Sequence, residues 1–286
     1  MNSLSYKLFA PIFKLIPLKA KLRILYLRRF GRLLNLNSPK SFNEKLQLYK
    51  IKHNDSLMTI CTDKVLVKDY LKTLDIDISF PKTLFKFFNE SEIHRFDFNK
   101  LPDNYVLKAN HTSQTILFSN KEKKLNKTDF LKAFRSWIKK DQYASLGEWS
   151  YKDIERCIFV EEFLDFKGKP PNDYKVFCFN GDPKYVQVDY DRFDKHKRNL
   201  YTNKWEFLNF EYSHPNLMPI EKKPKFLKEM LEISKIISTK FPFVRIDFYY
   251  YENKLMVGEM TFYPGGGFEK FPNYDLDIKF GNNLRL

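Results

Sequence analysis

The 286-residue sequence predicts a mixed α+β protein, and three observations support this class. Helix signals lie mainly in the first half of the chain, whereas strand-like runs crowd together in the second half. Short turns join several of these runs, as in antiparallel sheets, and the runs do not alternate regularly with helices. A hydrophobic content of 43% and an aromatic content of 17% are typical of a folded chain with one or two cores.

Capping residues and periodicity predict the helices. The stretch Ser41-Phe-Asn-Glu44 spells a capping box, so a helix should begin there. Thr62 is expected to cap a second helix over residues 63–74. Residues 125–140 repeat apolar side chains at helical spacing, and residues 224–240 begin with a proline, which is common in a first helical turn.

Two hairpins and two further strands are predicted. The turn Asn180-Gly-Asp-Pro183 should join strands at residues 174–179 and 184–190. A Glu-Asn-Lys turn should pair Phe243–Tyr251 with Lys254–Thr261. The other strands are expected at Tyr105–Ala109 and at residues 157–163, and the second of these should enter a polar loop over residues 165–172.

The last predicted hairpin carries a charged group. Arg245 and Asp247 are two residues apart and therefore share a face of their strand, as do Glu259 and Thr261 on the next strand. If the strands pair, the two carboxylates repel each other unless a cation bridges them. Mg²⁺ commonly combines one or two carboxylates with substrate phosphates, and an arginine can bind a phosphate oxygen. On spacing alone, however, an exposed charged hairpin is the better explanation.

Glycines and lysines strengthen the interpretation as a nucleotide site. The turn Pro264-Gly-Gly-Gly267 could bring backbone N–H groups close to an anion, because no Cβ intervenes. Lys108 in a strand-like run and Lys64 in the first turn of a predicted helix could reach phosphates. Taken singly, each lysine would be read as an ordinary surface residue.

The formal net charge of +15 indicates an acidic partner such as a nucleotide, nucleic acid, anionic lipid or acidic polymer. A lysine-rich proteome would explain the charge equally well, and no motif of a known nucleic-acid module occurs. Three cysteines without metal spacing favour a reducing cytoplasm. Residues 18–34 alternate basic and apolar side chains, so they predict either an ordinary surface helix, which is slightly favoured, or a helix that lies on the anionic inner membrane face.

Seven motifs occur in a recognisable order between about residues 40 and 271. They are SFNEKLQ (41–47), Asp63-Lys64, VLKANH (106–111), FVEEFL (159–164), DYKVFCFNGDPKYVQVDYDR (173–192), FPFVRIDFY (241–249) and GEMTFYPGGGFEKF (258–271). Together they resemble the ATP-grasp superfamily, specifically its teichuronopeptide-biosynthesis (TupA-like) branch from bacterial surface-polysaccharide pathways. The resemblance implies an ATP-grasp domain over residues 41–286 with two α+β subdomains that grip the nucleotide. A small lid is expected at about residues 105–160, after a basic helical region at residues 1–40.

The resemblance also implies an activity and its residues. ATP would phosphorylate a carboxylate, with Mg²⁺, and an amine would attack the acyl phosphate to form an amide. The implied cofactor contacts are Lys64 and Lys108 on the phosphates, Glu161, Glu162, Phe163 and Leu164 on adenine, Asp173 near the ribose, and His111 either at a phosphate or in loop geometry. The implied catalytic residues are Lys175, Arg198 and Arg245, and the implied metal ligands are Asp247, Glu259 and Thr261, the last where many relatives carry asparagine.

The leading hypothesis is a cytoplasmic ligase that joins an amino acid or another amine to a uronic-acid carboxylate of a capsule, lipopolysaccharide or other bacterial surface glycan. Relatives usually carry a glycine-rich loop where this chain has residues 112–116 without glycine, although hydroxyls of Thr112, Ser113 and Thr115 could replace backbone donors. A degenerate, non-catalytic binding protein is therefore an alternative. A glycosyltransferase is another, because Asp189-Tyr-Asp191 matches the D-x-D pattern that holds a divalent cation.

Overall fold

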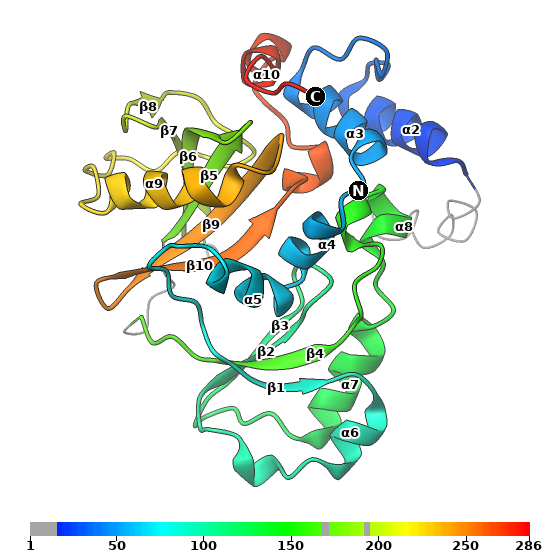
Figure 1. Ribbon diagram of the computed structural model, residues 1–286, viewed down its shortest axis with the longest axis vertical. Coiled ribbons are helices and arrows are strands. Elements are labelled where there is room, and N and C mark those ends of the chain that lie inside the picture. Colours follow the sequence, from blue (N-terminus) through cyan, green and yellow to red (C-terminus); the bar gives the residue numbers. More distant parts are fainter. Residues whose placement is uncertain (1–15, 167–171, 192–194) are drawn as a thin grey trace.

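The computed structural model describes residues 16–166, 172–191 and 195–286. These residues form two antiparallel sheets with helices around them, which confirms the predicted α+β class (Figure 1). The strands of the larger sheet are β5 (Asp173–Phe179), β6 (Asp182–Tyr190), β7 (Lys197–Thr202), β8 (Phe207–Leu208), β9 (Phe243–Tyr251) and β10 (Lys254–Thr261). Their spatial order is β10-β9-β5-β6-β7-β8, so both predicted hairpins are confirmed.

The smaller sheet has the order β1-β4-β2-β3. Its strands are β1 (Thr83–Phe87), β2 (Tyr105–Ala109), β3 (Ile116–Ser119) and β4 (Ile158–Glu162). Two of these, β2 and β4, were predicted, whereas β1 and β3 were not. Because β1 precedes residue 105, the small sheet begins earlier in the chain than the predicted lid, and the domain boundaries themselves stay a prediction.

The helices cover the outer faces of the sheets and the space between them (Figure 1). They are α2 (Leu18–Phe30), α3 (Phe42–Lys52), α4 (Ser56–Thr62), α5 (Leu66–Lys72), α6 (Glu90–Arg95), α7 (Lys127–Trp137), α8 (Gln142–Leu146), α9 (Leu227–Ser238) and α10 (Tyr274–Gly281). Helix α9 packs on the apolar face of the larger sheet, and α7 packs against the smaller one. The predicted capping box is confirmed, because Ser41 Oγ accepts from the Glu44 N–H while Glu44 Oε2 accepts from the Ser41 N–H.

One helix prediction was wrong. Thr62 ends α4 instead of capping a helix over residues 63–74, and its buried hydroxyl has no hydrogen-bond partner. Asp63 separates α4 from α5, because its carboxylate accepts from the N–H groups of Val65 and Leu66 and from Asn110 Nδ2. The predicted loop over residues 165–172 lies largely outside the described residues, because these exclude 167–171.

The basic helix α2 packs against the rest of the protein through one part of its surface and exposes the other part. Leu22 and Tyr26 are buried, whereas Ile24 and Leu27 are exposed between basic residues. Within the ranges that the structure describes, no helix combines the length and apolar character needed to cross a bilayer.

Gly281 allows α10 to pack directly on the chain that leads into α3. A Cβ at this position would lie 2.4 Å from the Lys40 carbonyl oxygen and 2.7 Å from the Phe42 nitrogen. Because both neighbours are backbone atoms, Gly281→Ala is expected to lower the free energy of unfolding by about 1–3 kcal/mol. Urea denaturation measures this loss, and the exposed Lys279→Ala on the same helix should change stability by no more than about 0.5 kcal/mol. Equal stability of Gly281→Ala and the unsubstituted protein would contradict this account of the packing.

Candidate functional site

One face of the larger sheet carries most of the predicted site residues. In the strand register, Lys175 lies opposite Asp247, Asp247 lies opposite Glu259, and Arg245 lies opposite Thr261. Directly opposed residues share a face, so the prediction that the two carboxylates meet on one surface is confirmed. The alternate residues of β5, β6 and β9 form the apolar face that packs against α9.

A buried ion-pair network connects these side chains. Lys175 Nζ lies 2.8 Å from Asp173 Oδ2 and 3.0 Å from Asp247 Oδ2. Arg245 binds both Asp247 oxygens, each at 2.7 Å, and also donates to Thr261 Oγ1 at 3.3 Å. Burial alone would raise the pKa of Asp247, but the Arg245 and Lys175 cations hold it below its usual value. Asp247 is therefore ionised and held between the Arg245 and Lys175 side chains.

Arg198 extends the network toward a neighbouring loop. Its Nε and Nη2 donate to the two Asp189 oxygens at 2.6 and 3.2 Å, and its Nη1 donates to Glu269 Oε1 at 3.2 Å. Burial opposes ionisation of Asp189, but Lys175 and Arg198 hold its pKa well below the usual value. Asp191 lies beyond the end of β6 and is exposed. Asp189 is therefore a buried partner of Arg198, whereas Asp191 is exposed, so the two acids of the D-x-D pattern lie in different surroundings.

The face of the smaller sheet opposite its apolar core presents a second charged group. Glu161 Oε1 accepts from Lys68 Nζ at 2.8 Å, and Glu161 Oε2 accepts from Lys108 Nζ. Burial would raise the pKa of Glu161, but these two cations lower it. Lys68 was not among the predicted residues, although it lies four positions after Lys64, the spacing of neighbours on a helix face.

Lys64 connects the two sheets. Its Nζ donates to the Thr112 carbonyl oxygen at 2.9 Å, in the loop that follows β2, and lies 3.6 Å from Glu259 Oε1 on β10. Lys64 is therefore brought beside Glu259, whereas the Nζ atoms of Lys68 and Lys108 contact Glu161 on the smaller sheet.

Residues 161–164, the segment predicted to contact adenine, do not share one face of the smaller sheet. Glu162 follows Glu161 in the strand and points the other way, where its Oε1 accepts from the Lys82 N–H at 2.7 Å. The Phe163 ring is exposed and meets the Phe118 ring edge-on, with 6.4 Å between centroids. Phe118 on β3 lies on the face that carries Lys108 and was missed because β3 was not predicted. Leu164 is half-buried, and a pocket of about 520 Å³ is lined by Leu84, Phe85, Lys100, Leu101, Pro102, Asn104, Glu162 and Phe163.

The interpretation of the glycine turn requires a correction. Gly265, Gly266 and Gly267 have φ of 54°, 64° and 69°, a left-handed run that other residues rarely adopt. The Gly266 N–H donates to the Tyr263 carbonyl oxygen at 2.7 Å, so it does not face an anion. Instead, the Gly266 carbonyl oxygen accepts from Lys50 Nζ at 2.7 Å, which attaches the turn to α3.

The loop after β2 also differs from a phosphate-binding loop rich in glycine. His111 is buried, with its ring nitrogens 3.1 Å from Asn110 Oδ1 and 3.1 Å from the Trp137 carbonyl oxygen. Burial lowers the pKa of His111 to about 4, and the two ring contacts favour the loop-geometry role. Gln114 takes the left-handed conformation with φ of 57°, and the buried Thr115 hydroxyl has no hydrogen-bond partner.

The donor set near Glu259 fits Mg²⁺ that is shared with a phosphorylated ligand. Within the described residues, no three His, Cys, Asp or Glu side chains gather closely enough to hold a metal ion by themselves. Asp247 and Glu259 supply two carboxylates, the number that Mg²⁺ commonly takes from protein when phosphates and water complete its shell. The Thr261 hydroxyl adds a neutral oxygen beside them.

Comparisons with known proteins place the chain in a family. A search of curated proteins found no match. Among solved structures, the chain is similar to the ATP-grasp ligase PsnB complexed with minimal precursor, with 10% identity, 84% of this chain and 66% of that chain covered, and a TM-score of 0.43. It is also similar to D-alanine–D-alanine ligases from Helicobacter pylori (18% identity, 79% and 62% covered, TM-score 0.41) and Bacillus anthracis (15%, 77% and 63%, 0.43).

The chain spans less than two thirds of the length of each of these three structures. The family assignment rests on a different comparison, with family models. The model described as TupA-like ATPgrasp matches residues 44–285, which includes both sheets and every predicted site residue. The chain therefore belongs to the TupA-like ATP-grasp family.

Proposed function

We propose that the protein is an ATP-dependent ligase that joins a carboxylate to an amine through an acyl phosphate. The observation that carries the proposal is the charge network of Lys175, Asp247 and Arg245, which lies beside Glu259 and is linked to the smaller sheet by Lys64. Phosphoryl transfer depends mainly on positioning and on neutralising charge, and this network provides both without a nucleophilic side chain.

The proposed reaction has two steps. A substrate carboxylate oxygen attacks the γ-phosphorus of ATP, and ADP leaves. The amine nitrogen then attacks the acyl carbon, the C–O bond to phosphate breaks, and the nitrogen loses a proton as the amide forms. Lys64 and Lys108 would bind phosphate oxygens, and Arg245 would stabilise the negative charge that develops in each step.

Asp247 and Glu259, with Thr261 beside them, would hold Mg²⁺, which neutralises phosphate charge when bound. On the smaller sheet, Phe118 and Phe163 offer exposed rings against which adenine could stack. Glu161, which accepts from Lys108 Nζ, would hold this side chain in place until ATP binds. The buried Asp173, which contacts Lys175, stays the predicted ribose contact.

The substrates that we propose are a uronic-acid carboxylate of a bacterial surface glycan or its precursor, and an amino acid as the amine. The net charge of +15 suits both ATP and an acidic glycan. We also propose a cytoplasmic location with contact to anionic lipid through α2, where exposed Ile24 and Leu27 lie among Arg23, Arg28 and Arg29.

The test measures ADP release with Mg-ATP, galacturonate or glucuronate and a mixture of amino acids. We expect release only when sugar acid and amine are both present, and mass spectrometry should find the amide. A degenerate binding protein is the second candidate, because Gln114 stands in the left-handed position of a loop without glycine. Mg-ATP that raises the melting temperature without any ADP release would favour this candidate, whereas a rise with UDP-sugars alone would favour a glycosyltransferase.

A further inference from the structure

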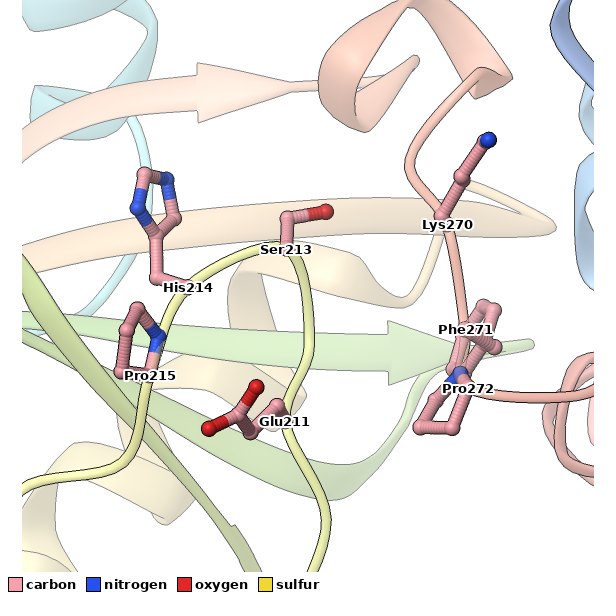
Figure 2. A pocket seen from close by; sticks show the side chains of 7 residues that line it. All are labelled: Glu211, Ser213, His214, Pro215, Lys270, Phe271 and Pro272. Carbon is pink, nitrogen blue, oxygen red and sulfur yellow. The ribbon is translucent and has the colours of Figure 1, made fainter.

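The pocket of about 330 Å³ between residues 211–215 and 270–272 is lined by opposite charges (Figure 2). Glu211 lies on one wall and Lys270 on the other, so the lining favours neither an anion nor a cation. The smaller sheet has a more informative feature, because an unpredicted buried lysine there shares a carboxylate with a predicted phosphate contact. This lysine is Lys68 on α5, and the carboxylate belongs to Glu161 on β4.

Lys68 is held by three acceptors. Its Nζ donates to the Pro81 carbonyl oxygen at 2.6 Å, to Thr83 Oγ1 at 2.9 Å and to Glu161 Oε1 at 2.8 Å. An ammonium group has three N–H donors, so these contacts use all of them. The residue is 8% exposed, and its Nζ lies 5.7 Å from the centre of the Phe159 ring. Lys68 is therefore fixed in place and has no donor left for a phosphate.

Lys108 is held less firmly on the same carboxylate. Among the residues that the structure describes, its Nζ donates to Glu161 Oε2 and makes no second hydrogen bond. Its side chain is 25% exposed, compared with 10% for Lys68. Lys108 can therefore exchange one contact, the bond to Glu161, for a phosphate oxygen, whereas Lys68 would have to break three.

The exchange would leave Glu161 with a single cation. This carboxylate is buried, which raises its pKa, but Lys108 and Lys68 together hold the pKa below its usual value. Breaking a buried ion pair by removing one partner is strongly destabilising, because the remaining charge has neither water nor a counter-ion. The free energy needed to separate Lys108 from Glu161 therefore depends on the cation that stays behind.

We propose that Lys68 is a positioning residue for nucleotide binding, which stays on Glu161 while Lys108 leaves this carboxylate for a phosphate oxygen. Lys68 thereby lowers the cost of releasing Lys108 and keeps Glu161 ionised in the segment predicted to contact adenine. The proposal rests on the proposed function, in which Lys108 binds a phosphate of ATP. It adds a third lysine that acts on the nucleotide without touching it.

Calorimetry with ATP and Mg²⁺ tests this role. Lys68→Met should raise the Kd for ATP about tenfold, because Lys108 is then the sole cation on Glu161 and would leave a buried charge behind. Adenosine has no phosphate to bind Lys108, so its Kd should change by less than about twofold. A merely structural role would weaken both ligands alike. The matched control is Lys72→Ala, one turn later on α5, whose exposed side chain pairs with Asp69 and which should bind ATP normally.

A second comparison applies even if Lys68→Met does not fold. In Lys68→Met/Glu161→Gln, no buried carboxylate needs a cation. If Lys68 acts only through Glu161, the double variant should bind ATP within about twofold of Glu161→Gln alone. Tenfold weaker binding by the double variant would show that Lys68 acts on the nucleotide directly, and it would overturn the proposal. So would equal losses of ATP and adenosine affinity in Lys68→Met.

These measurements need neither the carboxylate nor the amine substrate, so they separate this proposal from the proposed function. The expected affinities without any ADP release in the ligase assay would support the role of Lys68 and count against the ligase. ADP release together with an unchanged Kd for ATP in Lys68→Met would support the ligase and overturn the role of Lys68. Failure of the unsubstituted protein to bind ATP would overturn both.

Discussion

Glu259→Gln is expected to lower ADP release by about 100- to 1,000-fold, the usual loss when one group that stabilises transition-state charge is removed. The substitution keeps the shape of the side chain but removes the negative charge that Mg²⁺ requires. Glu259 is 28% exposed and its ion-pair contact with Lys64 is long, at 3.6 Å. Its loss should therefore leave the melting temperature unchanged. Initial rates at saturating Mg-ATP and a thermal melt check both parts.

Lys108→Met tests the same site from the smaller sheet. It should reduce turnover to a similar extent, because it removes a cation that would bind phosphate, while Lys68 continues to neutralise Glu161. Lys124→Ala is the matched control, since Lys124 pairs with Asp103 on the surface of the same region. Full activity in both Glu259→Gln and Lys108→Met would refute the assignment of the site.

Lys50→Met is expected to lower the free energy of unfolding by about 3–5 kcal/mol, because it removes a buried cation that interacts with the Glu148 carboxylate and leaves two carbonyl oxygens without this donor. Lys50 is 1% exposed and Glu148 is 6% exposed. Burial lowers the pKa of Lys50 and raises that of Glu148, and each charge partly opposes the effect of burial on the other. Lys50 Nζ also donates to the carbonyl oxygens of Leu146 and Gly266, so its loss would release the glycine turn.

Guanidinium denaturation of three variants checks this expectation. The double variant Lys50→Met/Glu148→Gln should recover part of the loss, because no uncompensated charge stays buried. Lys52→Met lies on the same helix and is exposed, so it should change stability by no more than about 0.5 kcal/mol. Similar losses in Lys50→Met and Lys52→Met would show that the buried pair does not stabilise the fold.

Local signals predicted much of this fold. The capping box at Ser41 begins α3, because its two side chains bind the N–H groups of that same turn. The Asn-Gly turn at Asn180 joins β5 and β6, although the Asn180 N–H also donates to the distant Pro242 carbonyl oxygen. The prediction for Thr62 failed because of a distant contact. Asp63 ends α4 because its carboxylate also binds Asn110, 47 residues later in the chain, and no helix propensity encodes that contact.

The sequence by itself determined which residues share a face of each strand, because side chains alternate with a period of two. This sufficed to place Arg245, Asp247 and Glu259 together once the hairpin was recognised. Only the tertiary structure decided the partners that come from distant segments: Lys68 beside Glu161, Lys50 near Glu148, and the pocket between His214 and Lys270. These contacts depend on how separate elements pack, and packing is set by the shapes and charges of surfaces that are not adjacent in the chain.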